Sequence, residues 1–567
     1  MRSPKADVTV VGAGIAGLTA ALRLAEREYR VEIFELGEEI GGNLRISKVF
    51  PHMFLNWYNN FWQLAADLGL RRDQDFEPIT GFKFLEKGKF PEFMEWTNLG
   101  SAKTVWDNLR SGVAPIPDLF LAAYAVLDLL SQRFDSTQIL SRISVNDFLA
   151  SRPYASNRMA QLHDDFLQTI WSLHSYLTSA ASYQDFIKYS FRHPEPQLWR
   201  LRGDIDANLL NPLKARLAGL GCSINTQRMV SKVDLKNDRV ASITVSYPDG
   251  TNETTVPVEN LVLSVPPKWL AYLVMGEWSV AGVSPGKASQ RAVTILPQLA
   301  QLRRLRTEPI PVVDVYFNKN IPNIPREYVA LLGSLYDLTF AEIPSGQPNT
   351  TAIAVAASDF YALPEAIKRK PVGIEDVMNL DGHEILLELS AYLGFNPGTF
   401  WGDPDSDIDW GKTTFSDNTE HELFVDEVGC EQWCLEPSVD RIANIFFAGD
   451  FCKTSVSIAT VEAAVMSGLN AASALWKKQP RGSKVEIYEP DAYPREAILI
   501  LKTLLFPHAV AAKLWSLAYD AAESFGHSSK KSNNLADLLV APYTRVTDCF
   551  LRAWSIYGQI FSAAKKG

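Results

Sequence analysis

The sequence predicts an α/β fold built on a Rossmann-type parallel sheet, interleaved with a mixed-sheet and helical region and followed by a helical extension. Three observations predict it. A buried β-branched strand at residues 8–11 runs directly into a glycine-rich turn and a helix. Short apolar strand patterns recur far along the chain, at residues 261–265 and 445–448. A long alanine-rich helix follows the last of these, which is the strand–helix order of a parallel sheet.

Composition limits the functional classes. The chain has 567 residues, of which 47% are apolar and 21% charged, typical of a globular protein. Its 55 basic and 65 acidic residues give a net charge of −10, which argues against nucleic-acid binding because phosphate binding needs a basic surface. Five cysteines form no disulfide framework and indicate a cytoplasmic location. Cys430 and Cys434 have no second pair, so we expect no metal site. No run of about 18–20 apolar residues predicts a membrane span.

The remaining elements follow from periodicity and turn residues. Helical patterns cover residues 18–28, 119–130 and 144–191, the last rich in aromatic side chains. Strand patterns lie at residues 31–35, 223–225, 230–235, 240–247, 312–317 and 351–356. Helical spacing returns at residues 457–476 and in the tail beyond residue 480, with a polar break at residues 528–534.

The glycine-rich turn reads Gly12-Ala13-Gly14-Ile15-Ala16-Gly17. Gly12 and Gly14 let the backbone turn tightly and approach a pyrophosphate, and Gly17 lets the helix lie close to the strand. Free N–H groups at the helix N-terminus then face the phosphate. Glu35 ends the second strand, where its carboxylate can accept the ribose hydroxyls of FAD or NAD and repel the 2′-phosphate of NADP.

Two further features favour FAD over NAD. The pair Gly41-Gly42, followed by Asn43 and Arg45, comes just after the second strand and suits a longer, extended cofactor. Gly449 and Asp450 follow the last strand, where a carboxylate can hold a ribityl or ribose hydroxyl. The helix predicted at residues 457–476 then directs its N-terminus at the N1–C2=O edge of the flavin, which gains negative charge on reduction.

With these residues the chain resembles the flavin amine oxidase superfamily, and within it the phytoene and ζ-carotene desaturases and the hydroxysqualene dehydroxylases. The opening VVGAGIAGLTAALRL and the closing FFAGDFCKTSVSIATVEAAVMSGLNAA are similar to the two ends of that fold. Internal stretches such as PHMFLNWYNN and LRGDIDANLL extend the likeness over residues 6–478. The resemblance implies a GR2-like flavoprotein with a discontinuous FAD-binding domain (residues 1–95, 196–270 and 440–478). It also implies a substrate domain (residues 96–195 and 271–439) and a helical C-terminal extension (residues 479–567).

The resemblance also implies roles for single residues. It places Gly12, Gly14 and Gly17 at the pyrophosphate, Glu35 at the adenosine ribose, Val230 at the adenine, Asp450 at the flavin end, and the Ile458 and Ala459 backbone near the isoalloxazine. His52, in a stretch with Phe54, Tyr58 and Asn60, is either a catalytic acid or base on the substrate side of the flavin or a structural histidine. Asn43 stands where the superfamily commonly has Arg or Lys. No cysteine is placed for covalent attachment, so we expect FAD to be non-covalent.

The implied activity is FAD-dependent desaturation or oxidation of a long apolar isoprenoid or lipid, by hydride transfer to flavin N5. The aromatic residues at 54–62 and 148–191 either line an apolar tunnel or form ordinary core. Residues 115–130 and 497–515 either contact a membrane peripherally, with Lys502 and Lys513 at headgroup level, or pack within the protein. Two other functions stay open: an amine oxidase that produces hydrogen peroxide, and a non-catalytic flavin-binding pathway partner.

Overall fold

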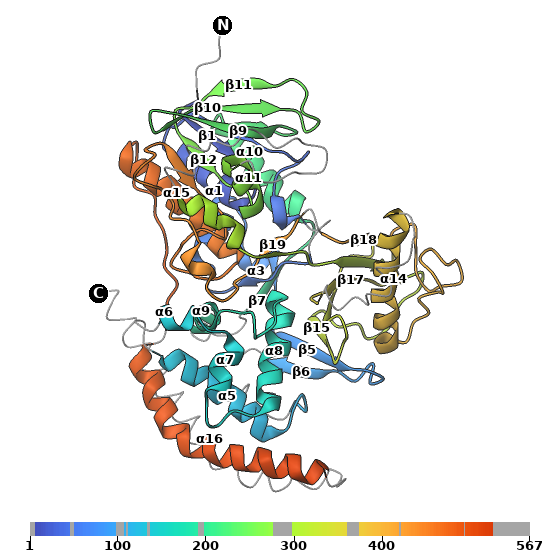
Figure 1. Cartoon of the computed structure of the whole chain (residues 1–567). Coiled ribbons are helices and arrows are strands. Elements are labelled where there is room, and N and C mark those ends of the chain that lie inside the picture. Colours follow the sequence, from blue (N-terminus) through green and yellow to red (C-terminus); the bar gives the residue numbers. More distant parts are fainter. Residues whose placement is uncertain are drawn as a thin grey trace.

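The structure, a computed structural model, describes residues 6–45, 50–97, 107–108, 111–132, 137–190, 198–275, 297–359, 374–418, 421–492 and 494–524. Three regions are visible in Figure 1. The predicted nucleotide-binding region lies at the top, a mixed sheet with one long helix projects to the right, and a helical region lies at the bottom.

A five-stranded parallel sheet forms the centre of the upper region, in the order β20-β12-β1-β2-β8. The strands are β1 (Val8–Val11), β2 (Val31–Phe34), β8 (Ser223–Asn225), β12 (Leu261–Leu263) and β20 (Ile445–Phe447). β1, β12 and β20 are buried at every position, as expected for parallel strands covered on both faces. The predicted α/β fold class is confirmed, and the sheet draws its strands from the start, middle and end of the chain.

Two helices that flank this sheet pack tightly on one another. They are α1 (Ile15–Ala25) and α15 (Val461–Lys478). The contact depends on Gly468, because a Cβ at that position would lie 2.3 Å from the carbonyl oxygen of Ala16. The first and last helices of the nucleotide-binding region are therefore interlocked.

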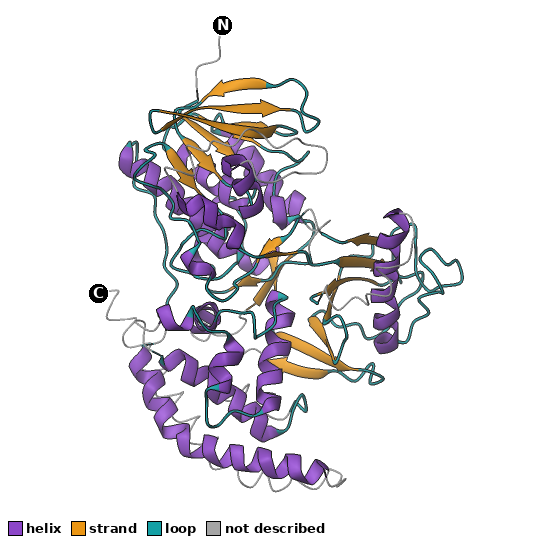
Figure 2. Cartoon of the chain, viewed as in Figure 1, coloured by secondary structure: helices purple, strands orange, loops and turns teal. Residues whose placement is uncertain are grey.

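The other sheets are antiparallel or mixed (Figure 2). A three-stranded antiparallel sheet consists of β9 (Met229–Lys236), β10 (Arg239–Ser246) and β11 (Thr254–Pro257). A small sheet orders β3 (Phe54–Leu55), β7 (Leu198–Leu201) and β4 (Phe76–Ile79). A seven-stranded sheet, in the order β18-β14-β17-β16-β15-β5-β6, comprises β5 (Gly81–Glu86), β6 (Met94–Thr97), β14 (Val312–Tyr316), β15 (Tyr328–Leu332), β16 (Leu338–Glu342), β17 (Ala352–Ala357) and β18 (Thr414–Ser416). The helix α14 (Ile374–Leu393) packs beside this sheet.

The bottom region is helical. It contains α5 (Ile116–Ser131), α7 (Val145–Ala150), α8 (Asn157–Trp171) and α9 (Ala180–Ser190), and the 30-residue helix α16 (Arg495–Ser524) runs along its outer edge. α5 packs against α8, α9 and α16. The sequence-predicted segment 115–130 is thus mainly a packed helix, and the polar break at residues 528–534 lies outside the described residues.

One helix boundary and the apolar character of one helix differ from the sequence-based expectation. α15 begins at Val461 rather than near residue 457, because the Thr460 hydroxyl caps it by accepting the Ala463 N–H at 3.2 Å. α16 is also long and apolar enough, by length and composition, to cross a membrane, although we expected no such segment. The sequence pattern did not single out this helix, because Lys502 and Lys513 interrupt its apolar run.

Candidate functional site

The glycine-rich turn lies where β1 ends and α1 begins. Gly12 has a φ of +98°, and a Cβ there would lie 2.0 Å from the Ser264 carbonyl oxygen, so only glycine fits. A Cβ on Gly17 would lie 2.2 Å from the Gly12 carbonyl oxygen. A Cβ on Gly14 would meet no protein atom within 4 Å. Two glycines therefore shape the turn, and the third leaves open space above the N-terminus of α1.

Glu35 follows β2 and reaches back to this turn. Its carboxylate accepts the Ala13 N–H at 2.6 Å and the Gly37 N–H at 2.8 Å. The Glu35 carbonyl accepts the Arg228 N–H at 2.8 Å, which brings the start of β9 beside it. Val230, predicted at the adenine, is buried two residues further along that strand.

The second glycine pair packs directly on the first turn. Gly41 donates its N–H to the Ala13 carbonyl at 2.8 Å and forms a parallel bridge with Gly14. Arg45 pairs with the carboxylates of Glu39 at 2.8 Å and Asp206 at 3.2 Å. The Arg45 guanidinium is thus already paired with two carboxylates, and a pyrophosphate would have to compete with them for it.

The distal end of the site follows β20. Gly449 has a φ of +151° and donates its N–H to the Ser467 hydroxyl at 2.8 Å, which ties it to α15. Burial raises the pKa of the adjacent Asp450 carboxyl to about 6. Ile458 and Ala459 lie in the loop just before α15. These residues therefore share one end of the nucleotide-binding sheet.

Sequence reasoning missed three acids near this loop: the buried Asp426 and the half-buried Asp185 and Glu431. The Asp426 carboxylate accepts the Ala459 N–H at 2.7 Å, and the Asp185 carboxylate accepts the Ser457 N–H at 3.3 Å. Burial, reinforced by repulsion between neighbouring carboxylates, raises the pKa of Asp426 and of Glu431 to about 7. These side chains come from segments far from residues 455–460 in sequence, so no local pattern pointed to them.

His52 lies next to the second glycine pair. Its Nε2 atom is 3.0 Å from the Asn43 carbonyl oxygen, and burial lowers its pKa. The imidazole is therefore neutral at physiological pH and is oriented by this hydrogen bond. Asn60, from the same motif, instead bonds the buried Glu462 carboxylate at 2.7 Å, and that carboxylate also accepts the backbone N–H groups of Asn60 and Phe61.

The aromatic residues near His52 are tightly packed. The rings of Phe54 and Phe61 stack with centroids 4.4 Å apart, and Phe76 and Trp62 meet edge to face at 4.9 Å. Trp57 and Tyr58 are also buried. Of the two interpretations of this aromatic segment, ordinary core is the one that describes it.

One group among the described residues has metal-ligand spacing, although we predicted none. Ligand atoms of His174, Asp337 and Asp359 lie within 4.8 Å of one another. His174 is already hydrogen-bonded to Asp164 at 3.2 Å. None of the predicted site residues belongs to this group.

The sequence has relatives among flavin and carotenoid enzymes. Residues 10–68 match the NAD(P)-binding Rossmann-like domain family. The chain is 22% identical to the carotenoid φ-ring synthase of Chlorobaculum tepidum over 43% of this chain and 40% of that protein. It is 24% identical to the flavin-dependent L-tryptophan oxidase of Lentzea aerocolonigenes, over 82% of this chain and 97% of that protein. It is 30% identical to the ζ-carotene desaturase of Solanum lycopersicum over 13% of this chain and 14% of that protein.

Solved structures share the fold over most of the chain. Putrescine oxidase bound to putrescine superposes with a TM-score of 0.54 at 16% identity, covering 84% of this chain and 99% of that one. Cyclohexylamine oxidase from Brevibacterium oxydans superposes with a TM-score of 0.52 at 14% identity, covering 84% of this chain and 100% of that one. The predicted superfamily resemblance is confirmed. By fold and by sequence, the chain is similar to oxidoreductases of the flavin amine oxidase and carotenoid desaturase class.

Proposed function

We propose that the chain binds FAD non-covalently and oxidises or desaturates a long apolar isoprenoid or lipid of the carotenoid or squalene type. One observation carries the cofactor assignment. The Gly14 opening and the Glu35 carboxylate lie at the ends of β1 and β2, and Asp450 follows β20 of the same parallel sheet. In such sheets a nucleotide lies across the carboxyl ends of the strands, and an extended cofactor spans both positions.

The residues divide the binding among them. The open space at Gly14 and the N-terminus of α1 would hold the pyrophosphate, with Gly12, Gly17, Gly41 and Gly42 shaping the turns. Glu35 would hold the adenosine ribose, Val230 the adenine, and Asp450 with the loop of Ile458 and Ala459 the flavin end. Bound FAD supplies a hydride acceptor at flavin N5. Neutral His52 would accept a proton on the substrate side.

The desaturase relatives support an apolar substrate. The relatives matched by sequence include a carotenoid φ-ring synthase and ζ-carotene desaturases, and those matches cover only part of each protein. A cytoplasmic location stays a prediction. It is supported by Cys222, Cys430, Cys434 and Cys452, which are free thiols in the described part of the chain.

An amine or amino-acid substrate is the second candidate, and two observations favour it. The tryptophan oxidase match spans nearly the whole of that protein. In addition, Asp426, Asp185 and Glu431 concentrate carboxylates around the loop before α15. Buried acids with raised pKa values favour a cationic ligand, because an ammonium group would offset their mutual repulsion.

One experiment separates the proposals. The purified chain is loaded with FAD and incubated under anaerobic conditions with phytoene- or squalene-type polyenes in lipid, or with amines and L-amino acids. Bleaching of the flavin absorbance reports hydride transfer without assuming an electron acceptor. Reduction by a polyene with a desaturated product supports the proposal. Rapid reduction by amines with inert polyenes supports the second candidate, and tight FAD binding with neither reaction supports a non-catalytic partner.

A further inference from the structure

The polarity of α16 is inverted relative to that of a helix on a water-facing surface. Its outward face carries seven large apolar side chains that are between 41% and 64% exposed: Leu499, Ile500, Leu504, Phe506, Val510, Leu514 and Leu517. Between residues 499 and 518, every exposed position holds an uncharged residue. We call these seven side chains the apolar stripe. Such a surface is costly in water and marks a contact with another apolar phase.

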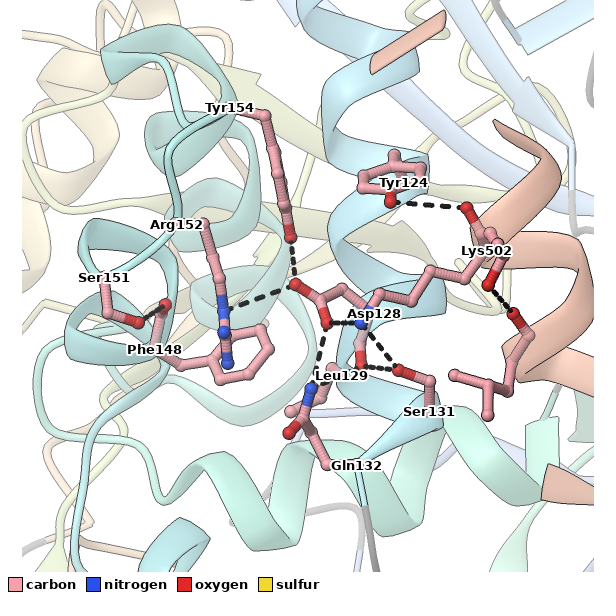
Figure 3. Close-up of polar contacts among 12 residues, drawn as sticks. Tyr124, Asp128, Leu129, Ser131, Gln132, Phe148, Ser151, Arg152, Tyr154 and Lys502 are labelled. Atoms are coloured by element: carbon pink, nitrogen blue, oxygen red, sulfur yellow. Dashed lines mark hydrogen bonds and ion pairs between the residues drawn. The ribbon is translucent and has the colours of Figure 1, made fainter. Parts of the chain in front are cut away.

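Three polar side chains in the middle of α16, those of Lys502, Lys513 and Ser516, bond groups inside the protein, and Figure 3 shows the contacts of Lys502. Lys502 bonds the buried Asp128 carboxylate of α5 at 2.6 Å and the Ser131 hydroxyl at 3.1 Å. Lys513 donates to the Ala155 carbonyl, and the Ser516 hydroxyl donates to the Asp118 carboxylate at 2.7 Å. The expectation that Lys502 and Lys513 lie at headgroup level is therefore wrong, because both amines have partners inside the protein.

We propose that the apolar stripe docks α16 in the plane of a lipid bilayer, with its inner face fastened to α5. The stripe runs from Leu499 to Leu517, a rise of about 27 Å along the helix. Its buried ion pair with Asp128 prevents lipid from surrounding the helix, so α16 lies on the membrane and does not cross it. This inference rests on α16 alone and does not depend on the proposed substrate.

A second copy of the chain fits the stripe less well. Protein–protein interfaces carry about one direct hydrogen bond per 100–200 Å² of buried surface. Thr503, a hydroxyl on this face, already donates to the Leu499 carbonyl at 2.7 Å. The stripe thus lacks the polar contacts of a protein interface, and hydrocarbon requires none.

Charge also decides the kind of membrane. The chain carries a net charge of −10, and no exposed lysine or arginine lies along the stripe between residues 499 and 518. An anionic surface would therefore repel the protein or add nothing to binding. The surface that fits is a zwitterionic bilayer, bound through hydrocarbon contact and insensitive to salt.

The test is flotation of the full chain with phosphatidylcholine vesicles. We expect the wild-type protein to float with the vesicles in 0.1 M and in 1 M NaCl. The double variant Ile500→Glu/Leu514→Glu should lower the partition coefficient about 100-fold, because two charges replace two side chains that would enter hydrocarbon. The matched control Leu335→Glu/Phe400→Glu alters two side chains of similar exposure away from α16 and should float like the wild type.

Folding and self-association are checked on the same samples. Both variants should keep the wild-type melting temperature, since the substituted positions are exposed. The proposal is overturned if the wild-type protein does not float, or if Ile500→Glu/Leu514→Glu floats equally well. It is also overturned if light scattering shows a lipid-free dimer that this variant dissociates while vesicles bind neither form, since the stripe would then serve a second copy. Flotation requires no turnover, so this result is separate from that of the substrate experiment.

Discussion

Replacing Gly14 by alanine should separate cofactor binding from folding. Gly14 has φ −70° and ψ 169°, which alanine adopts without strain, and the added Cβ would meet no protein atom within 4 Å. The alanine variant should be stabilised by about 0.4–1 kcal/mol because alanine restricts the unfolded chain, and it should be destabilised by a similar free energy because alanine is a poorer N-cap. The stability of the cofactor-free protein should therefore change by less than about 0.5 kcal/mol, a shift of about 1–2 °C in melting temperature.

The added methyl group would occupy the space through which a pyrophosphate approaches the N-terminus of α1. Losing one charge-assisted hydrogen bond there costs about 1.5–3 kcal/mol, or about 10- to 100-fold in the FAD dissociation constant. Isothermal titration of cofactor-free protein with FAD measures this loss, and thermal melting with and without FAD measures the stability. The matched control is Gly219→Ala at the end of α10 (Asn211–Gly219), where a Cβ also meets nothing.

Two results would refute this reasoning. If Gly14→Ala bound FAD as tightly as Gly219→Ala, the pyrophosphate would not pass over the glycine-rich turn. If Gly14→Ala lowered the melting temperature of the cofactor-free protein by more than about 5 °C, the space at Gly14 would be structural and not reserved for a ligand. Gly12→Ala is the opposite case and should prevent folding, since its Cβ would collide with the Ser264 backbone.

The remaining predictions concern charge. Lys502→Met should lower the free energy of unfolding by about 2 kcal/mol, measured by urea unfolding, because it leaves the buried Asp128 carboxylate with fewer partners. An unchanged urea midpoint would show that this contact does not hold α16 to α5. Asp426 has a pKa raised to about 7, so the folded state binds more protons than the unfolded state between about pH 4 and pH 7 and loses stability as pH rises through that window. Asp426→Asn should reduce this dependence of the melting temperature on pH, and an unaltered dependence contradicts the assignment. His163, hydrogen-bonded to the Tyr183 hydroxyl at 2.8 Å, has a pKa lowered by burial to about 4, so stability should fall as pH drops from about 6.5 to about 4; His163→Leu should remove that fall, measured by the same melts. If Asp426 faces bound flavin, Asp426→Asn should also raise the flavin reduction potential, measured by dye-coupled titration, and a potential at or below the wild-type value would place Asp426 away from the ring.

The local part of the site could be predicted from sequence because its signals are local. The strand, glycine turn and helix of residues 8–25 lie within one short stretch, and Glu35 is fixed by the length of the intervening helix and strand. Gly12 and Gly17 are required because a Cβ at either position would collide with the backbone, and such a requirement is visible in a single sequence as a glycine.

The rest depends on residues that meet only after folding. Asp426 reaches Ala459 across 33 residues, and Asp185 reaches Ser457 across 272, with no periodicity to connect them. The same holds for Lys502, whose partner Asp128 lies 374 residues away. From sequence alone a lysine in an apolar helix is expected to reach outward to water, and only the fold shows that this one bonds a buried carboxylate.

The interlocking of α1 and α15 through Gly468 has a consequence for synthesis on the ribosome. β12 stays an unpaired edge, and α1 lacks its packing partner, until residues 445–478 have emerged. At typical translation rates this leaves the glycine-rich turn, made within the first 35 residues, without its complete sheet for on the order of 20–90 s. The nascent chain therefore exposes an apolar parallel edge during most of its synthesis, and an unpaired edge of this kind is prone to aggregation until β20 covers it.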